Sequence, residues 1–264
     1  MLVETVRNPA VAGLFYPENA HELRTQVHQF VDPVPTDDAP VPKAIIAPHA
    51  GYIYSGPIAG SAYARLKKAA GRIRRVVLLG PAHRVAVRGL ALPSAKRFNT
   101  PLGSVAIDQE IAEALLALPQ VSINDATHAE EHSLEVHLPF LQEVLGEFSL
   151  VPLVVGDATA AEVAEVLEAV WGGDETLIVI SSDLSHYLDY DTASALDRRT
   201  SDAIESLDYE NLSYDQACGR IPVSGLLRVA RKKGLHGETI DLRNSGDTAG
   251  PRDRVVGYGA YVFS

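Results

Sequence analysis

The 264-residue chain contains a single cysteine, Cys218, so it cannot form an intrachain disulfide. This scarcity fits a reducing compartment, and we expect a cytoplasmic protein with one free thiol whose role has to be explained. The start of the chain lacks a basic flank followed by a long apolar run, and no apolar stretch reaches the roughly 20 residues that span a bilayer. We therefore predict neither a secretion signal nor a membrane partner.

Positive charge is also in short supply. Lys and Arg number 23 against 34 Asp and Glu, which gives a formal net charge of -11 and a pI near 5.2. The acidic residues are spread along the chain, and such a surface repels nucleic-acid phosphates and anionic lipid. We expect no nucleic-acid partner.

The signature loops of two large enzyme classes are missing as well. No G-x-S-x-G follows a predicted strand, which argues against serine hydrolysis of the nucleophile-elbow type. No Walker A or G-x-G-x-x-G loop follows a strand either, so nucleotide binding by those modes is unsupported.

Apolar residues are plentiful, at 46% of the chain, and charged residues make up 22%, so a sizeable core can be buried and disorder is not expected. Residues 31–42 are rich in Pro and Asp and are predicted to form a loop. The loop comes too early to divide the chain, because the 30 residues before it could hardly build a core alone. We predict one domain over residues 1–264.

Short β-branched runs alternate with stretches of helical periodicity. Strands are predicted at 44–47, 76–79, 150–155 and 177–180, with a late, antiparallel edge strand at 254–263. Helices are predicted at 57–70, 107–115, 163–170 and 192–206. This alternation predicts an α/β fold: a single domain with an open mixed sheet, a parallel core and helices on both faces.

Three of the predicted strands end alike, with an apolar run, then small or turn-forming residues, then a histidine. The three histidines are His49, His83 and His186. Because the carboxyl ends of parallel strands share one edge of a sheet, these imidazoles can converge. Imidazole binds Zn, Fe and Cu, and it also carries protons near neutral pH. A single histidine after a strand is more often a hydrogen-bonded loop residue, but three in the same position favour a metal or acid/base site.

A fourth segment, residues 128–137, packs three histidines and three glutamates into ten residues. Pro139 is best tolerated in a first helical turn, so the segment is predicted to lie at or just before a helix start. A polar helix entry, with Glu favoured by the helix dipole, explains it slightly better than direct metal ligation. A role for one of these histidines, such as His132, in contacting substrate or orienting a ligand stays open.

The sequence pattern does not decide the roles of two further residues. Cys218 in an apolar context is by itself most often a small buried hydrophobe. Asp183, three residues before His186, is a possible ligand, a partner that orients an imidazole, or a helix cap.

Taken in order along the chain, these segments resemble the Memo family, called AmmeMemoRadiSam system protein B in prokaryotes. The resemblance runs from about Val6 to the final strand. Six motifs carry it: PHAGY at 48–52 with YSG at 54–56, GPAH at 80–83, TPLG at 100–103, EHSLEVHLP at 131–139, SSDLSHY at 181–187 and ACG at 217–219.

The resemblance implies a fold similar to the class III extradiol ring-cleaving dioxygenases, which use non-haem Fe(II). It implies that His49 and His83 are metal ligands and that His186 stands in the place of an acid/base histidine. It also implies that Cys218 replaces the carboxylate ligand of the ring-cleaving enzymes. A thiolate is softer and more easily oxidised than a carboxylate, which favours copper or a more reducing iron site over ring cleavage.

The resemblance also implies partners: a radical-SAM protein and an AMMECR-type protein of the same system, besides an unidentified small-molecule or peptide ligand. The leading hypothesis is a metal-dependent redox enzyme in which His186 moves protons and Asp183 orients it. In this hypothesis Phe15 and Tyr54 wall the pocket.

Two alternatives stay open. One is a non-catalytic adaptor or ligand-binding protein that retains the pocket. The other is a zinc-dependent hydrolase, since two His and one Cys with an open position also suit zinc and an activated water.

Overall fold

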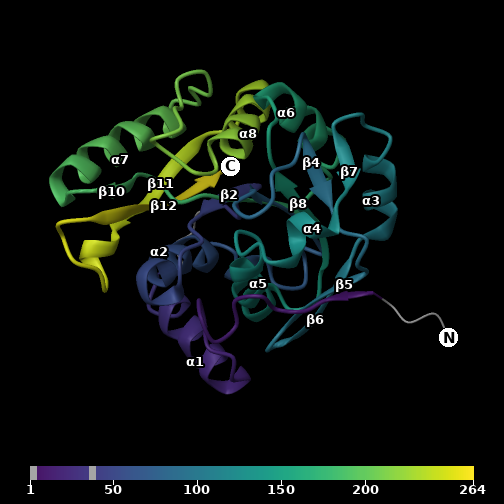
Figure 1. Cartoon of the computed structure of the whole chain (residues 1–264), viewed down its shortest axis with the longest axis horizontal. Helices are drawn as coiled ribbons and strands as arrows, with labels where there is room; N and C mark the ends of the chain where they lie inside the picture. Colours follow the sequence, from purple (N-terminus) through teal and green to yellow (C-terminus); the bar gives the residue numbers. More distant parts are fainter. Residues whose placement is uncertain (1–4, 36–39) are drawn as a thin grey trace.

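One mixed β-sheet of 12 strands forms the centre of the computed structural model, which describes residues 5–35 and 40–264. Its four central strands are neighbours and run parallel to one another (Figure 1). In order across the sheet they are β8 (Ser149–Val155), β3 (Arg75–Pro81), β9 (Thr176–Ser181) and β2 (Ala44–Ala47). These are the four strands predicted from the apolar runs, so the parallel core is confirmed.

Beyond β8 the sheet becomes mixed. There β6 (Gly103–Ile107) runs parallel to β8, β5 (Arg97–Thr100) is antiparallel to β6, and β1 (Val6–Arg7) lies at the edge. A branch made of β4 (Leu90–Leu92) and β7 (Val121–Ile123) also pairs with β8 through β4.

On the other side β12 (Val255–Phe263) is antiparallel to β2, as predicted, but the prediction that it forms an edge is wrong. Both β11 (Gly237–Asn244) and β10 (His186–Leu188) pair with it. The sequence pattern of β11 is mostly polar, because its residues are only partly buried, and it therefore gave no strand signal.

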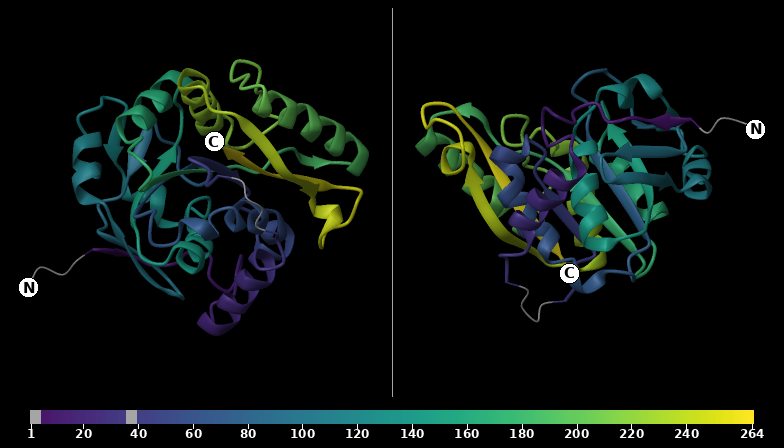
Figure 2. Two further views of the ribbon diagram at one scale, coloured as in Figure 1. Left: turned by 180° about the vertical axis from the view of Figure 1, so that it is seen from behind. Right: turned by 90° about the horizontal axis from the view of Figure 1, so that it is seen from below.

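Helices cover both faces of the sheet, as predicted, because alternate residues of each strand point to opposite sides (Figures 1 and 2). Ile45 packs in the core with α1 (Ala20–Val31), α2 (Tyr52–Ala64) and α5 (Leu138–Leu145). Ile46 packs in the opposite core, with α6 (Ala160–Ala169), α7 (Tyr190–Glu205) and α8 (Arg220–Lys233). The sheet thus separates two apolar layers.

The predicted helices at 163–170 and 192–206 correspond to α6 and α7, whereas two others differ in their limits. The helix predicted at 57–70 begins earlier, at Tyr52, and Pro57 lies inside it. The one predicted at 107–115 is α3 (Gln109–Leu115), because Ile107 belongs to β6. The remaining elements are short: α4 (Asp125–Ala129) and three 3-10 turns at Lys67–Ala69, Glu135–His137 and Ser245–Asp247.

The predicted loop at 31–42 follows the end of α1, and its residues 36–39 lie outside the described part of the chain. Of the helices in the described ranges, none is both long and apolar enough to cross a membrane.

Asp197 is a buried carboxyl on α7, only 2% exposed, and it faces β12 and the segment before β10. Its Oδ1 accepts a hydrogen bond from the Ser185 backbone N–H at 3.0 Å, and a Cβ at Gly257 would lie 1.9 Å from its Oδ2. Burial raises the pKa of Asp197 to about 6, although the hydrogen bonds from Ser185 lower it in part. The glycine on β12 is what makes room for this carboxyl.

We expect Asp197→Asn to remove a pH-dependent part of the stability. Because the pKa is higher in the folded than in the unfolded state, the carboxyl stabilises the fold fully below about pH 4 and loses that contribution as the pH rises through about 6. The free energy of unfolding of the variant, relative to that of wild type, should therefore rise by about 2 kcal/mol from about pH 4.5 to about pH 7.5. Urea unfolding at the two pH values measures this change. The exposed Asp202 on the same helix, changed to Asn, serves as the control. A wild-type-minus-variant difference that is the same at both pH values would contradict the prediction.

Candidate metal site

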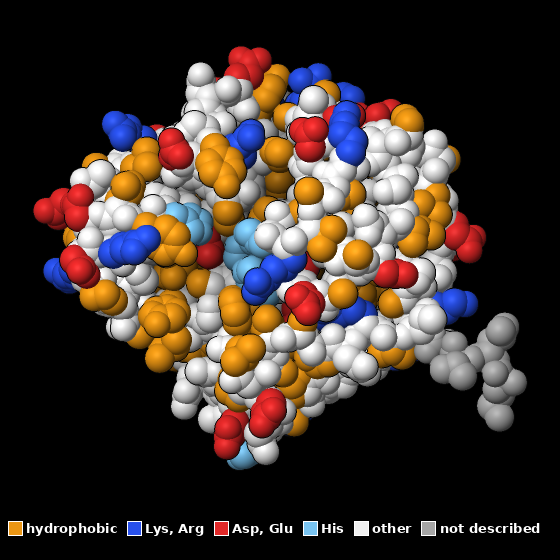
Figure 3. Space-filling view, viewed as in Figure 1, with side chains coloured by type: hydrophobic (Ala, Val, Ile, Leu, Met, Phe, Trp, Pro, Cys, Tyr) orange, Lys and Arg blue, Asp and Glu red, His pale blue; other side chains and the backbone are white. Residues whose placement is uncertain are grey.

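Three histidines meet beyond the carboxyl ends of the central strands. One ring nitrogen from each of His49, His83 and His132 lies within 4.8 Å of the others, which makes the group able to hold a metal ion. The ring centroids of His49 are 5.1 Å from His83 and 5.5 Å from His132. Figure 3 shows histidine side chains gathered in a hollow near the middle of this face. Burial is graded across the group, from the buried His49 to the exposed His83.

The hydrogen bonds of His49 fix its tautomer. Its Nδ1 lies 2.6 Å from the Ser181 hydroxyl oxygen, and that hydroxyl donates its only proton to the Ser133 carbonyl at 2.6 Å. The Ser181 oxygen must therefore accept from Nδ1–H, which leaves the lone pair on Nε2. Burial, followed by the charges of neighbouring histidines, holds the pKa of His49 well below its usual value. His49 is thus a neutral imidazole with a free Nε2.

Glu131 fixes the tautomer of His83, as Ser181 fixes that of His49. The carboxylate accepts from the His83 backbone N–H at 2.6 Å and from its Nδ1–H at 2.9 Å. Burial would raise the pKa of Glu131, but the hydrogen bonds and charge of His83 outweigh it and bring the pKa to about 2. An ionised carboxylate can only accept, so Nδ1 carries the proton that faces Glu131, and Nε2 is the ring nitrogen left for a metal ion. A carboxylate behind a ligating histidine is the usual arrangement in metal sites.

Glu131→Gln is expected to weaken metal binding by about 10- to 100-fold, since partners behind ligating histidines contribute that much. The amide can still fill the space but no longer holds the His83 ring as an anionic acceptor. Competition titration with a chromophoric chelator measures the affinity. The adjacent exposed Glu130, changed to Gln, should leave the affinity unchanged. Equal affinities in wild type and E131Q would show that Glu131 does not orient His83.

His132 completes the group and stacks on His83, with centroids 4.8 Å apart and planes at 17°. Phe15 packs on it at 4.8 Å. Burial lowers the pKa of His132 to about 4, so the ring is neutral at neutral pH. Gly80 permits this approach, because a Cβ there would lie 2.8 Å from the Ser133 hydroxyl.

Cys218 lies in the turn just before α8, with its Sγ 3.4 Å from His49 Nε2. Two ligands of one tetrahedral ion, bonded at about 2.1 Å through nitrogen and 2.3 Å through sulfur, lie about 3.6 Å apart. The observed distance therefore suits co-ligands as well as an S–H···N hydrogen bond. Burial and the nearby Asp183 raise the pKa of the thiol, so it is protonated without a cation. Gly219 allows this approach: a Cβ there would lie 2.5 Å from the Ser181 carbonyl.

Asp183 lies beside the group, 5% exposed. Its Oδ1 accepts from the His49 backbone N–H at 2.7 Å, while its Oδ2 is 3.9 Å from His49 Nε2. Burial raises the pKa of Asp183, and the hydrogen bond from His49 lowers it in part. The carboxyl is thus hydrogen-bonded to the main chain of His49 rather than to the ring of His186.

His186 lies on the exposed side of the same cavity. Its Nδ1–H donates to the Leu184 carbonyl at 2.8 Å, so Nε2 is the ring nitrogen left free of this bond. The cavity encloses about 980 Å³, and Phe15, Tyr54 and Tyr258 contribute to its walls. It is at the upper end of the range for small-molecule sites.

The structure therefore gathers every residue that the sequence singled out around one cavity. His49, His83, Cys218, Asp183, His186, Phe15, Tyr54 and His132 all line it.

The sequence reasoning missed three contributions to this site. His132 belongs to the metal-capable group rather than to a polar helix entry alone. Glu131 and Ser181, which fix the two tautomers, belong to the motifs at 131–139 and 181–187, but no pattern indicated their roles, because these depend on which loops meet. The H-x-x-E-H spacing of 128–132 could not distinguish a helix start from a ligand segment.

The chain resembles one protein family over nearly its full length. A family model described as Memo-like protein matches residues 7–262. A MEMO1 family protein of Aquifex aeolicus is 38% identical, covering 98% of this chain and 99% of the relative. MEMO1 family protein MK0963 of Methanopyrus kandleri is also 38% identical, covering 97% and 98%. The crystal structure of uncharacterized protein JW3007 from Escherichia coli K12 matches with a TM-score of 0.49 at 14% identity, over 83% of this chain and 98% of that one.

Proposed function

The chain belongs to the Memo family, and we propose that it is a metal-binding, redox-active protein whose ion is held by His49, His83, His132 and the Cys218 thiolate. One observation carries the proposal. The hydrogen-bond partners of His49 and His83 hold the proton on Nδ1 in both rings, so the lone pair of each Nε2 is available to a metal ion. Each ring is thereby held in the tautomer that ligation through Nε2 requires, with a protein partner fixing the other nitrogen, as is usual for metal-ligating histidines.

The donor set indicates the kind of metal. Imidazole nitrogens with one soft sulfur suit iron, copper or zinc and exclude a calcium- or magnesium-type site. Iron or copper, when bound, would supply one-electron chemistry. We propose iron or copper, with zinc as the redox-silent alternative that would suit a hydrolase.

The surrounding residues have separate tasks in this proposal. Ser181 and Glu131 hold the ligand rings in place, and Asp183 fixes the backbone of His49. His186 takes up or delivers a proton at Nε2, since its Nδ1–H is committed to a carbonyl and the ring is open to the cavity. Phe15 and Tyr258 form part of the cavity wall and limit the access of water to the histidine group.

The test is to purify the protein without oxygen and to measure its metal content and redox titration. Iron or copper at about one ion per chain with a reversible redox signal is the expected result. Zinc at full occupancy with no redox signal would favour the hydrolase instead. No bound metal under any loading condition would overturn the proposal.

A second candidate function is that of an adaptor that retains the pocket, and the mouth of the cavity favours it. Six exposed large hydrophobic side chains either line the cavity or directly adjoin lining residues in the chain: Leu14, Ile53, Tyr54, Val85, Tyr187 and Tyr214. Exposed apolar side chains concentrated in one place mark interaction sites. The radical-SAM and AMMECR-type proteins of the same system are the proposed partners.

Pull-down with these two partners separates the candidates. Retention of the complex by His49→Ala and His83→Ala, together with an absence of redox activity in wild type, would favour the adaptor. Redox activity of the purified protein that both variants lose would favour the metal enzyme.

A further inference from the structure

We propose that Tyr52 is a positioning residue for the histidine group, because its hydroxyl joins the segment that follows His49 to the segment that carries His132. The inference rests on the proposed function and deepens it, since it names a residue that sets the spacing of the ligands without contacting the ion. Tyr52 is only 2% exposed and is not among the residues that line the cavity, so it acts from within the core.

The side chain of Tyr52 reaches the backbone of His132 through Val136. Tyr52 is the first residue of α2, three positions after His49. Its hydroxyl donates to the Val136 carbonyl at 2.7 Å, and the Val136 N–H donates to the His132 carbonyl at 3.3 Å. Burial raises the pKa of the Tyr52 phenol well above its usual value, so the hydroxyl keeps its proton at neutral pH. Two hydrogen bonds in series therefore connect the start of α2 to His132.

The backbone of Tyr52 makes a second connection to the same histidine. Its N–H donates to the Phe15 carbonyl at 2.7 Å. The Phe15 ring in turn packs on the His132 ring, with the two centroids 4.8 Å apart. Tyr52 is thus linked both to the main chain of His132 and to the residue that covers its ring.

A single anchor would not fix the direction of the His132 ring. The carbonyl of Ser133, the next residue, accepts from the Ser181 hydroxyl at 2.6 Å, and the Ser133 hydroxyl donates to a carbonyl at the end of β3 at 2.9 Å. These bonds hold the chain just after His132 but leave the segment free to rotate about that point. The bond from Tyr52 to Val136 supplies a second fixed point, which removes the rotation.

Tyr52 is one of three buried tyrosines whose hydroxyls meet consecutive residues of the 3-10 turn at 135–137. Tyr16 donates to Glu135 at 2.5 Å, but that carboxylate also accepts from a guanidinium and from two backbone N–H groups. Tyr63 bonds the last residue of the turn at 2.8 Å, from about three helical turns further along α2. Of these three tyrosines, Tyr52 is the one that directly follows a histidine of the group.

Tyr52→Phe removes the hydroxyl and keeps the packing of the ring. The ring centroid lies 4.9 Å from that of Phe140, 5.6 Å from Tyr16 and 6.2 Å from Phe30. A phenylalanine ring retains all three contacts. The variant therefore separates the effect of the hydrogen bond to Val136 from the effect of ring burial.

Tyr261→Phe is the matched control for the loss of a buried hydroxyl. Tyr261 is fully buried in the opposite apolar layer, and its hydroxyl lies 2.8 Å from that of Ser201. Its removal also deletes one buried hydrogen bond, but far from the histidines. Any general effect of such a deletion on stability appears in both variants.

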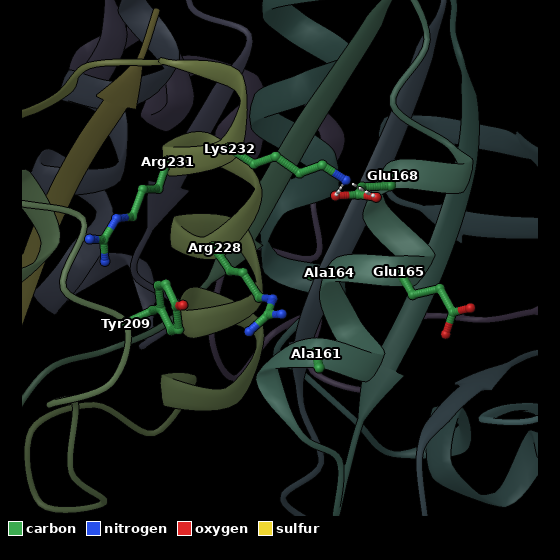
Figure 4. Close-up of a pocket in the computed structure, with 8 residues that line it drawn as sticks. All are labelled: Ala161, Ala164, Glu165, Glu168, Tyr209, Arg228, Arg231 and Lys232. Carbon is green, nitrogen blue, oxygen red and sulfur yellow. Dashed lines mark hydrogen bonds and ion pairs between the residues drawn. The ribbon is translucent and has the colours of Figure 1, made fainter.

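A second control addresses metal bound to carboxylates outside the histidine group. The cavity between α6 and α8 encloses about 500 Å³ and contains Glu165 and Glu168 (Figure 4). Its described lining residues include neither histidine nor cysteine, and Glu168 is already bonded to Lys232 at 2.8 and 2.9 Å. Glu168→Gln should therefore leave tight metal binding unchanged.

The first measurement is the affinity for Co²⁺ without oxygen, by competition with a chelator, together with the visible absorption spectrum of the bound ion. The spectrum reports the geometry of the ligands, which a general loss of stability does not alter. We expect Tyr52→Phe to bind Co²⁺ about tenfold more weakly than wild type and with a changed spectrum, the lower end of the effect of groups behind ligating histidines. Y261F and E168Q should match wild type in both.

The second measurement needs no metal: amide hydrogen exchange of residues 131–137 in chelator-treated protein. Loss of one buried hydrogen bond should speed exchange in this segment by about tenfold in Y52F, while exchange in β9 stays as in Y261F. If wild type binds no Co²⁺, the metal proposal fails, whereas locally faster exchange still upholds Tyr52 as the residue that fixes His132. Equal Co²⁺ affinity and spectrum in wild type and Y52F, unchanged exchange at 131–137, or the same changes in Y261F would overturn the inference.

Discussion

His49→Ala is expected to reduce bound metal from about one ion per chain to a few per cent, with an affinity loss of roughly 100-fold or more, since even partners behind a ligand contribute 10- to 100-fold. His49 is the centre of the group: both other histidine rings and the Cys218 sulfur lie around it. Its removal deletes one donor and leaves Ser181 without the ring that it orients. Mass spectrometry of the metal in anaerobically loaded protein gives the measurement.

The control for this change is His21→Ala, an exposed histidine of α1 whose side chain has no part in the group. H21A should retain the full metal content, and the unfolding transition should show that H49A is folded. A folded H49A with wild-type metal content would refute the assignment of His49 as a ligand.

Arg7→Met should lower the free energy of unfolding by about 3–5 kcal/mol, because it leaves the Glu135 carboxylate buried without its counter-charge. Glu135 is fully buried and accepts hydrogen bonds from Arg7, from the backbone N–H groups of Ala10 and Val11, and from the Tyr16 hydroxyl. Arg7 also donates to the Glu131 carbonyl at 2.7 Å. The pair thus fastens the start of the chain to the segment that carries Glu131 and His132.

Guanidinium unfolding measures this loss, with Arg88→Met as the control. Arg88 forms an equally direct but exposed pair with Glu162, and pairs of that kind contribute little. The double variant Arg7→Met/Glu135→Gln should be more stable than Arg7→Met alone, because no unpaired charge remains. A similar loss in R7M and R88M would mean that burial of Glu135 is not the cause.

The parallel core of the fold could be predicted because its strands are short, buried on both faces and bounded by turns. Ala44–Ala47 and Thr176–Ser181 were found to within a residue on this basis. The same pattern predicted that the histidines after the central strands would lie at one edge, and the structure brings together His49, which follows β2, and His83, which follows β3. The α8 helix was not predicted, because a proline such as Pro222 usually argues against a helix. In α8 it lies in the first turn, where a backbone N–H has no partner within the helix and its absence has no cost.

The arrangement inside the site could not be predicted from periodicity. The distance between Cys218 and His49 depends on Gly219, which allows the start of α8 to approach the end of β9. The role of Glu131 depends in turn on how the 131–134 segment packs on Gly80 of β3. Both are close contacts between segments far apart in the chain, and no local pattern records them.

The central claim, that the three histidines hold a metal ion, is tested most directly by an anomalous-difference map of crystals grown from anaerobically iron- or copper-loaded protein. We predict a single strong peak within bonding distance of Nε2 of both His49 and His83, in contact with His132. A fully loaded protein whose peak lies away from these nitrogens would contradict the claim.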